Sequence, residues 1–369
     1  MASIYIHIPF AEPVRKIPGI YREENPGLHT TYVQAVVAEM RHYGSLYGKE
    51  EAVETLHLGG GMPSLLSVDD LERMLHSLFS SFDGALHEAT IEVEPRHVTR
   101  DYLDSLHALG FTRVSLAVQS FYQEDLDRLQ MPHDAETASS AVELCLASDI
   151  EHLSVDFAVG LPEQPHEYWM ANLSRAARLD IGHITFDEVA GHERSEVLAD
   201  QLIEGAQFLK EHGYDHYEIS NFAREGARSR QNEAYWSLKN YLGFGTSAHS
   251  LWWRGLPAHR WENVTPSSRY QALIQQGHAP HSGRQALSLD DLADEFLMLQ
   301  LRTGDGVDLT ILDERFGLDL LDFAFDTVSS LQNEGYLLPV ENDRLRLSEK
   351  GFLVCDALTK RLLSAITIE

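Results

Sequence analysis

The stretch that decides the fold is residues 4–21, which read IYIHIPFAEPVRKIPGIY. Residues 4–8 are rich in β-branched and aromatic side chains, and this composition is typical of a buried strand. Pro9 ends the strand pattern, and further prolines at positions 13, 18 and 26 predict a loop over residues 12–27. A strand that leads into a long loop is therefore the first predicted unit.

Strand-like runs recur downstream and alternate with amphipathic helical stretches. Strands are predicted at 4–8, 55–58, 90–93, 114–118, 152–157 and 184–186, and helices at 29–47, 68–81, 99–109, 134–148, 166–179 and 196–213. Alternation at about 30–40 residues argues for parallel strands with right-handed crossovers. Six such units favour an α/β fold of the partial (β/α)6, TIM-like barrel type over a doubly wound sheet, although periodicity alone does not separate the two. A further strand at 216–219 is expected at the edge of the sheet.

A smaller region follows, and we predict domains at 1–285 and 286–369. Helical patterns at 290–302, 309–315 and 319–334 precede a polar turn at residues 341–343, which predicts a hairpin before a final helix. Helices followed by a β-wing predict a winged-helix-like α+β domain. Residues 290–369 contain 17 acidic and 7 basic side chains. A nucleic-acid-binding wing would need the opposite balance, so we expect this domain to pack on the barrel or to meet a protein.

The composition predicts a cytoplasmic protein that does not bind nucleic acid. The net charge is −28, with 57 acidic and 29 basic residues, and only six of the basic residues are lysine. Such a surface suits either a high-salt environment or a basic protein partner. No apolar run reaches about 18 residues, which argues against stable membrane insertion. There is no signal-peptide pattern, and Cys145 and Cys355 are far apart, so we expect free, buried thiols in a reducing compartment.

Candidate site residues gather where the predicted strands end. In β/α barrels the active site forms at the carboxyl ends of the strands and in the loops that follow. These positions contain Pro9-Phe10, the run GGGMPS at 59–64, Glu92 with Glu94, Gln119-Ser120, and Asp156. A glycine triplet lets backbone groups approach a ligand closely, and the two carboxylates Glu92 and Asp156 can accept ribose hydroxyls. The alternative is a tight turn beside solvated carboxylates.

Nine segments carry a specific resemblance that covers nearly the whole chain. They are YIHIPF (5–10), LHLGGGMPSLL (56–66), IEVEP (91–95), GFTRVSLAVQSF (110–121), VDFAVGLPEQ (155–164), YEISNFAREG (217–226), NEAYW (232–236), YLGFGTSAHS (241–250) and MLQLRTGDGVD (298–308). With these segments the chain resembles the HemW heme chaperones and the oxygen-independent coproporphyrinogen III oxidases of the radical-SAM superfamily. The segments at 217–226 and 232–236 resemble HemW more than the oxidase.

The resemblance implies a binding site for S-adenosylmethionine. Tyr5 matches the tyrosine beside this cofactor. Gly60, Gly61 and Met62 match the glycine loop that contacts its methionine end, with Met62 in place of the usual Thr or Ser. Glu92 resembles the ribose-side carboxylate, and Gln119 and Asp156 match polar residues further along the same cavity.

The departures from the family concern the metal. Ala11, Arg15 and Pro18 stand where family members have the three cysteines of a [4Fe–4S] cluster, which thiolates must hold. The sequence therefore predicts no [4Fe–4S] cluster, no metal ligand and no catalytic residue. Arg15 is a candidate for gripping the carboxylate of S-adenosylmethionine, with an exposed loop arginine as the alternative.

Heme is the second candidate ligand. Gln231 replaces the histidine of the H-N-x-x-Y-W motif, which resembles the heme-binding element of HemW, and glutamine ligates heme iron poorly. His259 and the tryptophans 252, 253 and 261 form an aromatic neighbourhood, which either stacks a porphyrin or closes a core.

Three functions follow from these observations. The first is a non-catalytic HemW-like protein that binds heme or another tetrapyrrole and passes it to a heme-accepting protein. The second is a pseudoenzyme that binds S-adenosylmethionine and has a regulatory role. An active coproporphyrinogen III oxidase ranks third, because the chain lacks the cluster ligands for radical chemistry.

Overall fold

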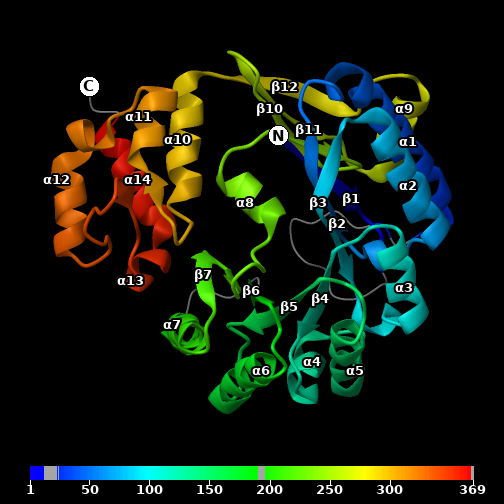
Figure 1. Ribbon diagram of the computed structural model, residues 1–369, viewed down its shortest axis with the longest axis horizontal. Coiled ribbons are helices and arrows are strands. Elements are labelled where there is room, and N and C mark those ends of the chain that lie inside the picture. Colours follow the sequence, from blue (N-terminus) through cyan, green and yellow to red (C-terminus); the bar gives the residue numbers. More distant parts are fainter. Residues whose placement is uncertain (12–22, 24, 190–195, 367–369) are drawn as a thin grey trace.

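The computed structural model describes residues 1–11, 23, 25–189 and 196–366 (Figure 1). Most of the loop predicted at residues 12–27, including Arg15 and Pro18, lies outside the described residues.

Six parallel strands form the centre of the molecule and follow one another in chain order. They are β1 Ala2–Ile8, β2 Val53–Gly60, β3 Gly84–Val93, β4 Arg113–Gln119, β5 His152–Val159 and β6 His183–Glu188. A doubly wound sheet would reverse its strand order part of the way across, and this sheet does not. The predicted parallel β/α arrangement is therefore confirmed.

Helices cover the outer face of these strands (Figure 1). They are α1 His29–Tyr47, α2 Val68–Ser81, α3 Arg100–Ala108, α4 Gln123–Leu129, α5 Ala135–Leu146, α6 His166–Arg178 and α7 Glu196–Glu211. Short 3₁₀ turns lie at Pro26–Leu28, Pro63–Leu65 and Pro95–His97. Ile4, Ile6 and Ile8 are fully buried in the core beneath the helices, because alternate residues of a strand point to one face.

The opposite face of the strands is polar and points into the barrel. Its residues along the walls of the internal cavities are Tyr5, His7, His57, Thr90, Glu92, Arg113, Ser115, Gln119, Ser154, Asp156, His183, Thr185 and Asp187. Many of these positions alternate with fully buried apolar residues of the outer face, such as Ile91, Val114 and Val155. Because alternate residues of each strand point to opposite faces, one face forms an apolar layer beneath the helices and the other forms a polar interior.

Further strands extend the sheet at both ends, giving twelve strands in all. Beyond β1 come β9 Tyr241–Phe244, β10 His249–Trp252, β11 Ala258–Asn263 and β12 His281–Leu287; beyond β6 come β8 Asn221–Ala223 and β7 Asp215–Glu218. The edge strand predicted at 216–219 is β7. Helix α8, Arg230–Trp236, contacts β1, β2 and α10, and α9, Ser267–Gln275, packs on α1.

The C-terminal region has its own hydrophobic core. It consists of α10 Leu289–Gln300, β13 Val307–Asp308, α11 Leu309–Phe316, α12 Leu320–Asn333, β14 Arg344–Leu345, α13 Glu349–Phe352 and α14 Cys355–Ile366. Bridges join Leu337 to Leu347 and Glu341 to Arg344 around the predicted turn, while β14 also pairs with β13. These helices with a short wing follow the predicted pattern.

The boundary at 285/286 stays a prediction. Leu238, Leu251 and Ala258 precede it and belong to the core of the C-terminal region. Among the described residues, no helix is long and apolar enough to cross a bilayer.

Candidate functional site

The polar face of the strands borders a partly open cavity of about 680 Å³, and most of the predicted site residues line it. Gly61, Met62, Glu92, Gln119 and Asp156 all border this space, which we call the barrel cavity. They come from four different segments of the chain. The parallel strands bring them together because their carboxyl ends meet at one edge of the barrel.

The glycine loop after β2 is fixed by close backbone contacts. Gly61 N donates to Ile8 O at 2.7 Å, and Met62 N donates to Phe10 O at 2.7 Å. A Cβ on Gly61 would lie 2.3 Å from Phe10 O, and one on Gly60 would lie 2.4 Å from the His7 ring. Gly60 also has φ +111°. Glycine is therefore required at both positions, and the loop lies directly against the segment that follows β1.

Glu92 connects this loop to the neighbouring strands. Its Oε2 accepts a hydrogen bond from Gly60 N at 3.1 Å, and its Oε1 lies 3.0 Å from His57 Nε2. Its side chain is 38% exposed, so part of the carboxylate still faces the cavity. Glu92 therefore shapes the loop and also remains accessible to a ligand.

Tyr5 lies beside the barrel cavity and lines a second cavity of about 550 Å³. His57 and Asn232 border both spaces. The Tyr5 hydroxyl is 3.1 Å from His7 Nδ1, and burial raises the pKa of Tyr5, so its hydroxyl stays neutral. Because this second cavity is bordered by His7, His57 and His249, we call it the histidine cavity.

Asp156 and Gln119 form the far wall of the barrel cavity. Burial raises the pKa of Asp156 to about 8, and the charge of Asp187 adds to the rise. Gln119 has φ +62° where β4 ends, and its Nε2 donates to Asp187 Oδ2 at 3.0 Å. On this wall Asp156 therefore keeps its proton near neutral pH, while the amide of Gln119 holds the carboxylate of Asp187 in place.

The mouth of the barrel has a brace that the sequence did not reveal. Glu94 accepts hydrogen bonds from the backbone N and the Nε of Arg96, at 2.9 and 3.0 Å, and its Oε1 lies 3.0 Å from His133 Nδ1. Burial alone would raise the pKa of Glu94, but His133 and Arg96 outweigh it and lower the pKa. His133 Nε2 lies 3.1 Å from Val118 O. The brace therefore ties β4 to the segment after β3.

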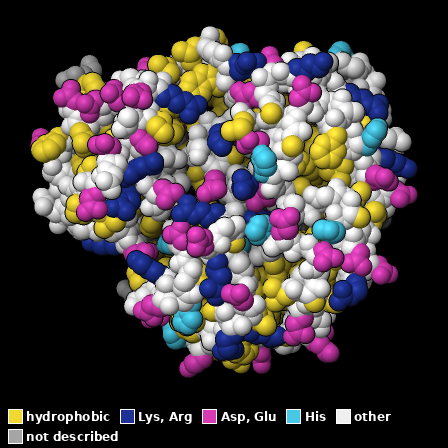
Figure 2. Space-filling model, viewed as in Figure 1, with side chains coloured by type: hydrophobic (Ala, Val, Ile, Leu, Met, Phe, Trp, Pro, Cys, Tyr) yellow, Lys and Arg dark blue, Asp and Glu magenta, His cyan; other side chains and the backbone are white. Residues whose placement is uncertain are grey.

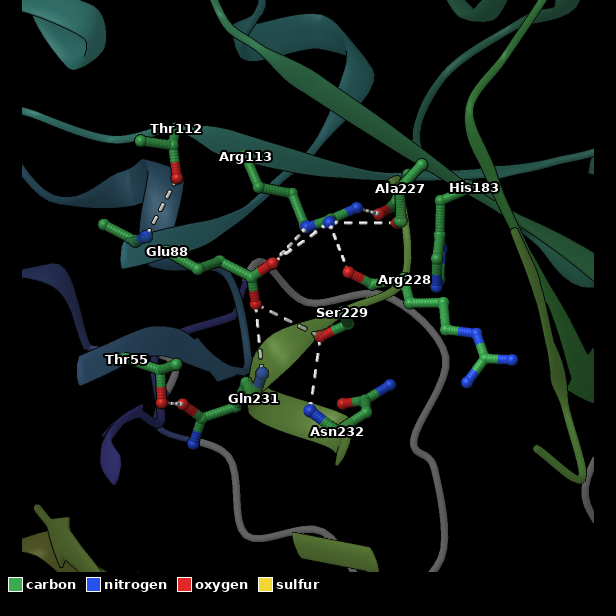
Figure 3. Close-up of polar contacts among 12 residues, drawn as sticks. Thr55, Glu88, Thr112, Arg113, His183, Ala227, Arg228, Ser229, Gln231 and Asn232 are labelled. Carbon is green, nitrogen blue, oxygen red and sulfur yellow. Dashed lines mark hydrogen bonds and ion pairs between the residues drawn. The ribbon is translucent and has the colours of Figure 1, made fainter. Parts of the chain in front are cut away.

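A buried ion pair closes the opposite end of the barrel (Figure 3). Arg113 and Glu88 are 1% and 2% exposed. Arg113 Nε and Nη2 donate to Glu88 Oε2 at 3.1 and 3.0 Å, and Nη2 also donates to Ala227 O and Arg228 O at 3.0 and 3.1 Å. Sequence analysis did not single out this pair, because both residues precede the predicted strands at 90–93 and 114–118.

Helix α8 is attached to the Arg113–Glu88 pair through Gln231 (Figure 3). Gln231 N donates to Glu88 Oε1 at 3.1 Å. Its side-chain Oε1 accepts from Thr55 Oγ1 at 2.5 Å, and its Nε2 donates to Tyr235 OH at 2.8 Å. Gln231 is 1% exposed. Both ends of its amide are used within the protein, so this position offers no group to a ligand.

The thiols lie in two separate hydrophobic cores. Cys145 is on α5 in the barrel core, where burial raises its pKa to about 12, and Cys355 is on α14 in the C-terminal core. Ala11 is 5% exposed, and its backbone N donates to Glu23 O at 3.1 Å. Arg15 and Pro18 lie outside the described residues. Within the described part of the chain, no three His, Cys, Asp or Glu residues are grouped to hold a metal ion.

The aromatic neighbourhood of His259 closes a core. Trp261 stacks on Tyr43 and Tyr47 with ring centroids 5.7 and 6.2 Å apart, and Trp252 lies 4.8 Å from Tyr47. Trp252 and Trp261 are buried in the barrel core. Of the two interpretations of this cluster, porphyrin stacking and the closing of a core, the second therefore holds for these two tryptophans.

Comparison with known proteins agrees with this geometry. Residues 28–176 match the model of the Radical SAM superfamily, and residues 287–354 match that of the HemN C-terminal domain. The heme chaperone HemW of Synechocystis sp. is 31% identical over 341 residues, which cover 83% of this chain and 79% of that protein. HemW of Bacillus subtilis is 26% identical over 375 residues, covering 96% of this chain and 97% of that protein.

A solved structure shares the whole fold. The Escherichia coli coproporphyrinogen III oxidase HemN, a radical-SAM enzyme, superposes with a TM-score of 0.81 over 98% of this chain and 89% of its own, at 22% identity. HemW of Escherichia coli is 30% identical over 266 residues, which cover 67% of this chain and 69% of that protein. On this ground, the chain belongs to the HemW/HemN-like family of the radical-SAM superfamily.

Proposed function

We propose that this protein binds heme or a related tetrapyrrole and passes it to a heme-accepting protein in the cytoplasm, without radical chemistry. One observation carries the proposal. The only two thiols of the chain are buried in different cores, and Ala11 occupies the first cluster position. A [4Fe–4S] cluster needs thiolate ligands at one place, and the residues present do not fit it.

Two observations support heme as the ligand. Two relatives that match most of this chain are named heme chaperones. In addition, the histidine cavity combines imidazoles with apolar side chains from Leu238, Leu251 and Leu299. Imidazole is a common axial ligand of heme iron, and apolar walls suit a porphyrin ring.

The site of ligation differs from the one implied by the family motif. Gln231 is buried and bonded at both ends of its amide. His57 and His249 border the histidine cavity, and their side chains are 18% and 57% exposed. We therefore place the ligating imidazole at one of these two histidines.

A heme titration tests the proposal. We expect a saturable Soret change for the wild-type protein, and an affinity at least about tenfold lower, or ~1.4 kcal/mol, for His57→Ala or His249→Ala. His278→Ala is the matched control, because His278 is exposed and lies on neither cavity. No saturable Soret change would exclude heme binding.

Anaerobic reconstitution with iron and sulfide tests the second part of the proposal, the absence of radical chemistry. We expect no stoichiometric cluster, and iron that is removed on a desalting column. Four irons retained per chain would contradict the absence of radical chemistry, whatever the heme titration shows.

The barrel cavity favours a second function, a regulatory pseudoenzyme that binds S-adenosylmethionine. The observation behind it is that Gly61, Met62, Glu92, Gln119 and Asp156 line one cavity. Without iron to chelate the methionine end, we expect weak binding. Calorimetry with S-adenosylmethionine checks this: heat that is lost in Glu92→Gln supports the function, and no heat at millimolar ligand contradicts it.

A further inference from the structure

A third cavity, of about 610 Å³, lies where α8 meets the C-terminal region. Five basic side chains border it: Arg228, Lys239, Arg315, Arg344 and Arg346. We call it the basic cleft. Its acidic residues number three, Glu233, Asp305 and Glu341. The whole chain has 57 acidic and 29 basic residues, so this local excess of cations runs against the composition.

Lys and Arg side chains are visible along this boundary on the surface of the molecule. Figure 2 shows them gathered between the C-terminal helices, on the left of the view, and the centre of the molecule, with Asp and Glu side chains between them.

Three of the five cations are held in place by carboxylates. Arg228 bonds to Asp215, to Asp305 at 2.8 Å and to Glu233 at 3.5 Å. Arg344 Nη2 lies 2.8 Å from Asp308, and Arg346 Nη2 lies 3.3 Å from Glu341. These pairs fix the positions of the guanidinium groups. They also account for the acidic residues of the cleft, which therefore do not neutralise the other two cations.

Lys239 and Arg315 have no carboxylate within ion-pair distance among the described residues. The Arg315 guanidinium lies over the rings of Trp253 and Phe316, at 4.3 and 5.2 Å. Contact with these rings desolvates part of the guanidinium and lowers the pKa of Arg315, while the side chain as a whole stays exposed, like that of Lys239. An anionic ligand can therefore reach both charges.

Two buried donors at the cleft also lack acceptors. In the part of the chain that the structure describes, Trp236 Nε1 and Arg346 Nε have no hydrogen-bond partner. Both residues border the cleft. Buried donors are nearly always bonded, so two orphans at one place point to an acceptor supplied from outside the chain.

We infer that the basic cleft binds a small organic anion with two or more carboxylate or phosphate groups. Lys239 and Arg315 supply the charge, and the indole of Trp236 and the Nε of Arg346 donate hydrogen bonds to the anionic oxygens. The aromatic rings of Trp236 and Phe296, which also border the cleft, can cover an apolar body of the ligand. This site is separate from the barrel cavity and does not depend on the proposed function.

Calorimetry with two probes at low ionic strength tests the inference. Inorganic pyrophosphate represents phosphates, and metal-free coproporphyrin III represents polycarboxylates. We expect at least one probe to bind, and Arg315→Gln to weaken its binding at least about tenfold, because the variant loses a charge-assisted hydrogen bond to the anion. Lys239→Gln should weaken it as well. Lys49→Gln, an exposed lysine remote from the cleft lining, should leave the affinity unchanged.

The outcomes separate the sources of the ligand. Binding of pyrophosphate alone assigns the site to phosphates, and binding of coproporphyrin alone assigns it to carboxylates. Arg315→Gln is the decisive variant, because Lys239 also borders the histidine cavity whereas Arg315 does not. Thermal unfolding of each variant verifies that it is folded. Failure of both probes at millimolar concentration, or full binding by folded Arg315→Gln, would overturn the inference.

Discussion

Arg113 and Glu88 show at the scale of single residues how a charge can be buried inside this barrel. Each nitrogen of the Arg113 guanidinium donates to a carboxylate, a hydroxyl or a backbone carbonyl, and Glu88 also accepts from Gln231 N. Removing one partner leaves the other charged and desolvated, which costs more than the pair itself contributes.

We therefore expect Arg113→Met to lower the free energy of unfolding by about 3–5 kcal/mol. The double variant Glu88→Leu/Arg113→Met should recover part of this loss, because it leaves no unpaired charge. Urea unfolding monitored by circular dichroism measures both. A free energy of unfolding of Arg113→Met within ~1 kcal/mol of the wild-type value would show that the pair does not stabilise this end of the barrel.

Asp156 makes a second prediction at this scale, concerning pH. Its folded pKa is about 8, whereas an unfolded Asp has a pKa near ~3.9. Between these values the folded state binds more protons than the unfolded state, so the contribution of Asp156 to stability falls as pH rises from ~4 to ~8 and then levels off.

Asp156→Asn should remove this contribution. We expect the unfolding temperature of the variant, relative to that of the wild type, to rise across this pH range. Glu39 and Glu218, whose burial raises their pKa values to about 7, change the stability of both proteins equally. The difference between the two unfolding temperatures, measured at several pH values, therefore reports Asp156 alone. A constant difference between the two proteins would contradict the raised pKa.

At the scale of elements, the glycine loop depends on close packing against the segment after β1. Gly60 and Gly110 both have positive φ, at +111° and +90°, but only Gly60 has a ring within reach of an added Cβ. A pair of alanine variants therefore separates backbone strain from steric overlap.

We expect Gly110→Ala to cost about 1–2 kcal/mol of stability from its positive φ. Gly60→Ala should cost ~1–3 kcal/mol more, because the His7 ring must move. Denaturant titration of the two variants gives the difference. Equal losses would mean that the ring adjusts freely and that the loop is not tightly packed.

The main elements were predictable because their apolar residues repeat with a clear period. Helices at 29–47 and 68–81 match α1 and α2 residue for residue, and the six central strands appear where apolar runs predicted them. Strands β11 and β12 were missed because their sequences, AHRWEN and HSGRQAL, are polar and lack a clear alternation. Such edge strands form through pairing with neighbours that are distant in sequence.

The candidate site was predictable only in part. The strand ends pointed to Glu92 and Asp156 because the topology fixes where such residues meet. The pairing of Glu94 with His133 and of Glu88 with Arg113 joins different strands and loops. Composition cannot show which charged residue finds a partner, so these braces required the structure.

At the scale of the whole molecule, the net charge of −28 opposes folding. Repulsion among like charges favours expansion, and salt screens it. We expect the unfolding temperature to rise steadily as NaCl is increased from low to molar concentration. Potassium chloride should act equally, since screening does not depend on the cation. An unchanged or falling unfolding temperature would show that ion pairs such as Arg361–Glu334 outweigh the repulsion.

Helix α8 has only seven residues, yet it is a wall shared by three compartments. Asn232 borders the barrel cavity and the histidine cavity, Tyr235 borders the latter, and Trp236 borders the basic cleft. The helix is bonded at one end to Glu88 and at the other to Gln300 of α10. A ligand that shifts α8 from one compartment would change the free energy of filling the next, and thermodynamic reciprocity requires such an effect to be equal in both directions.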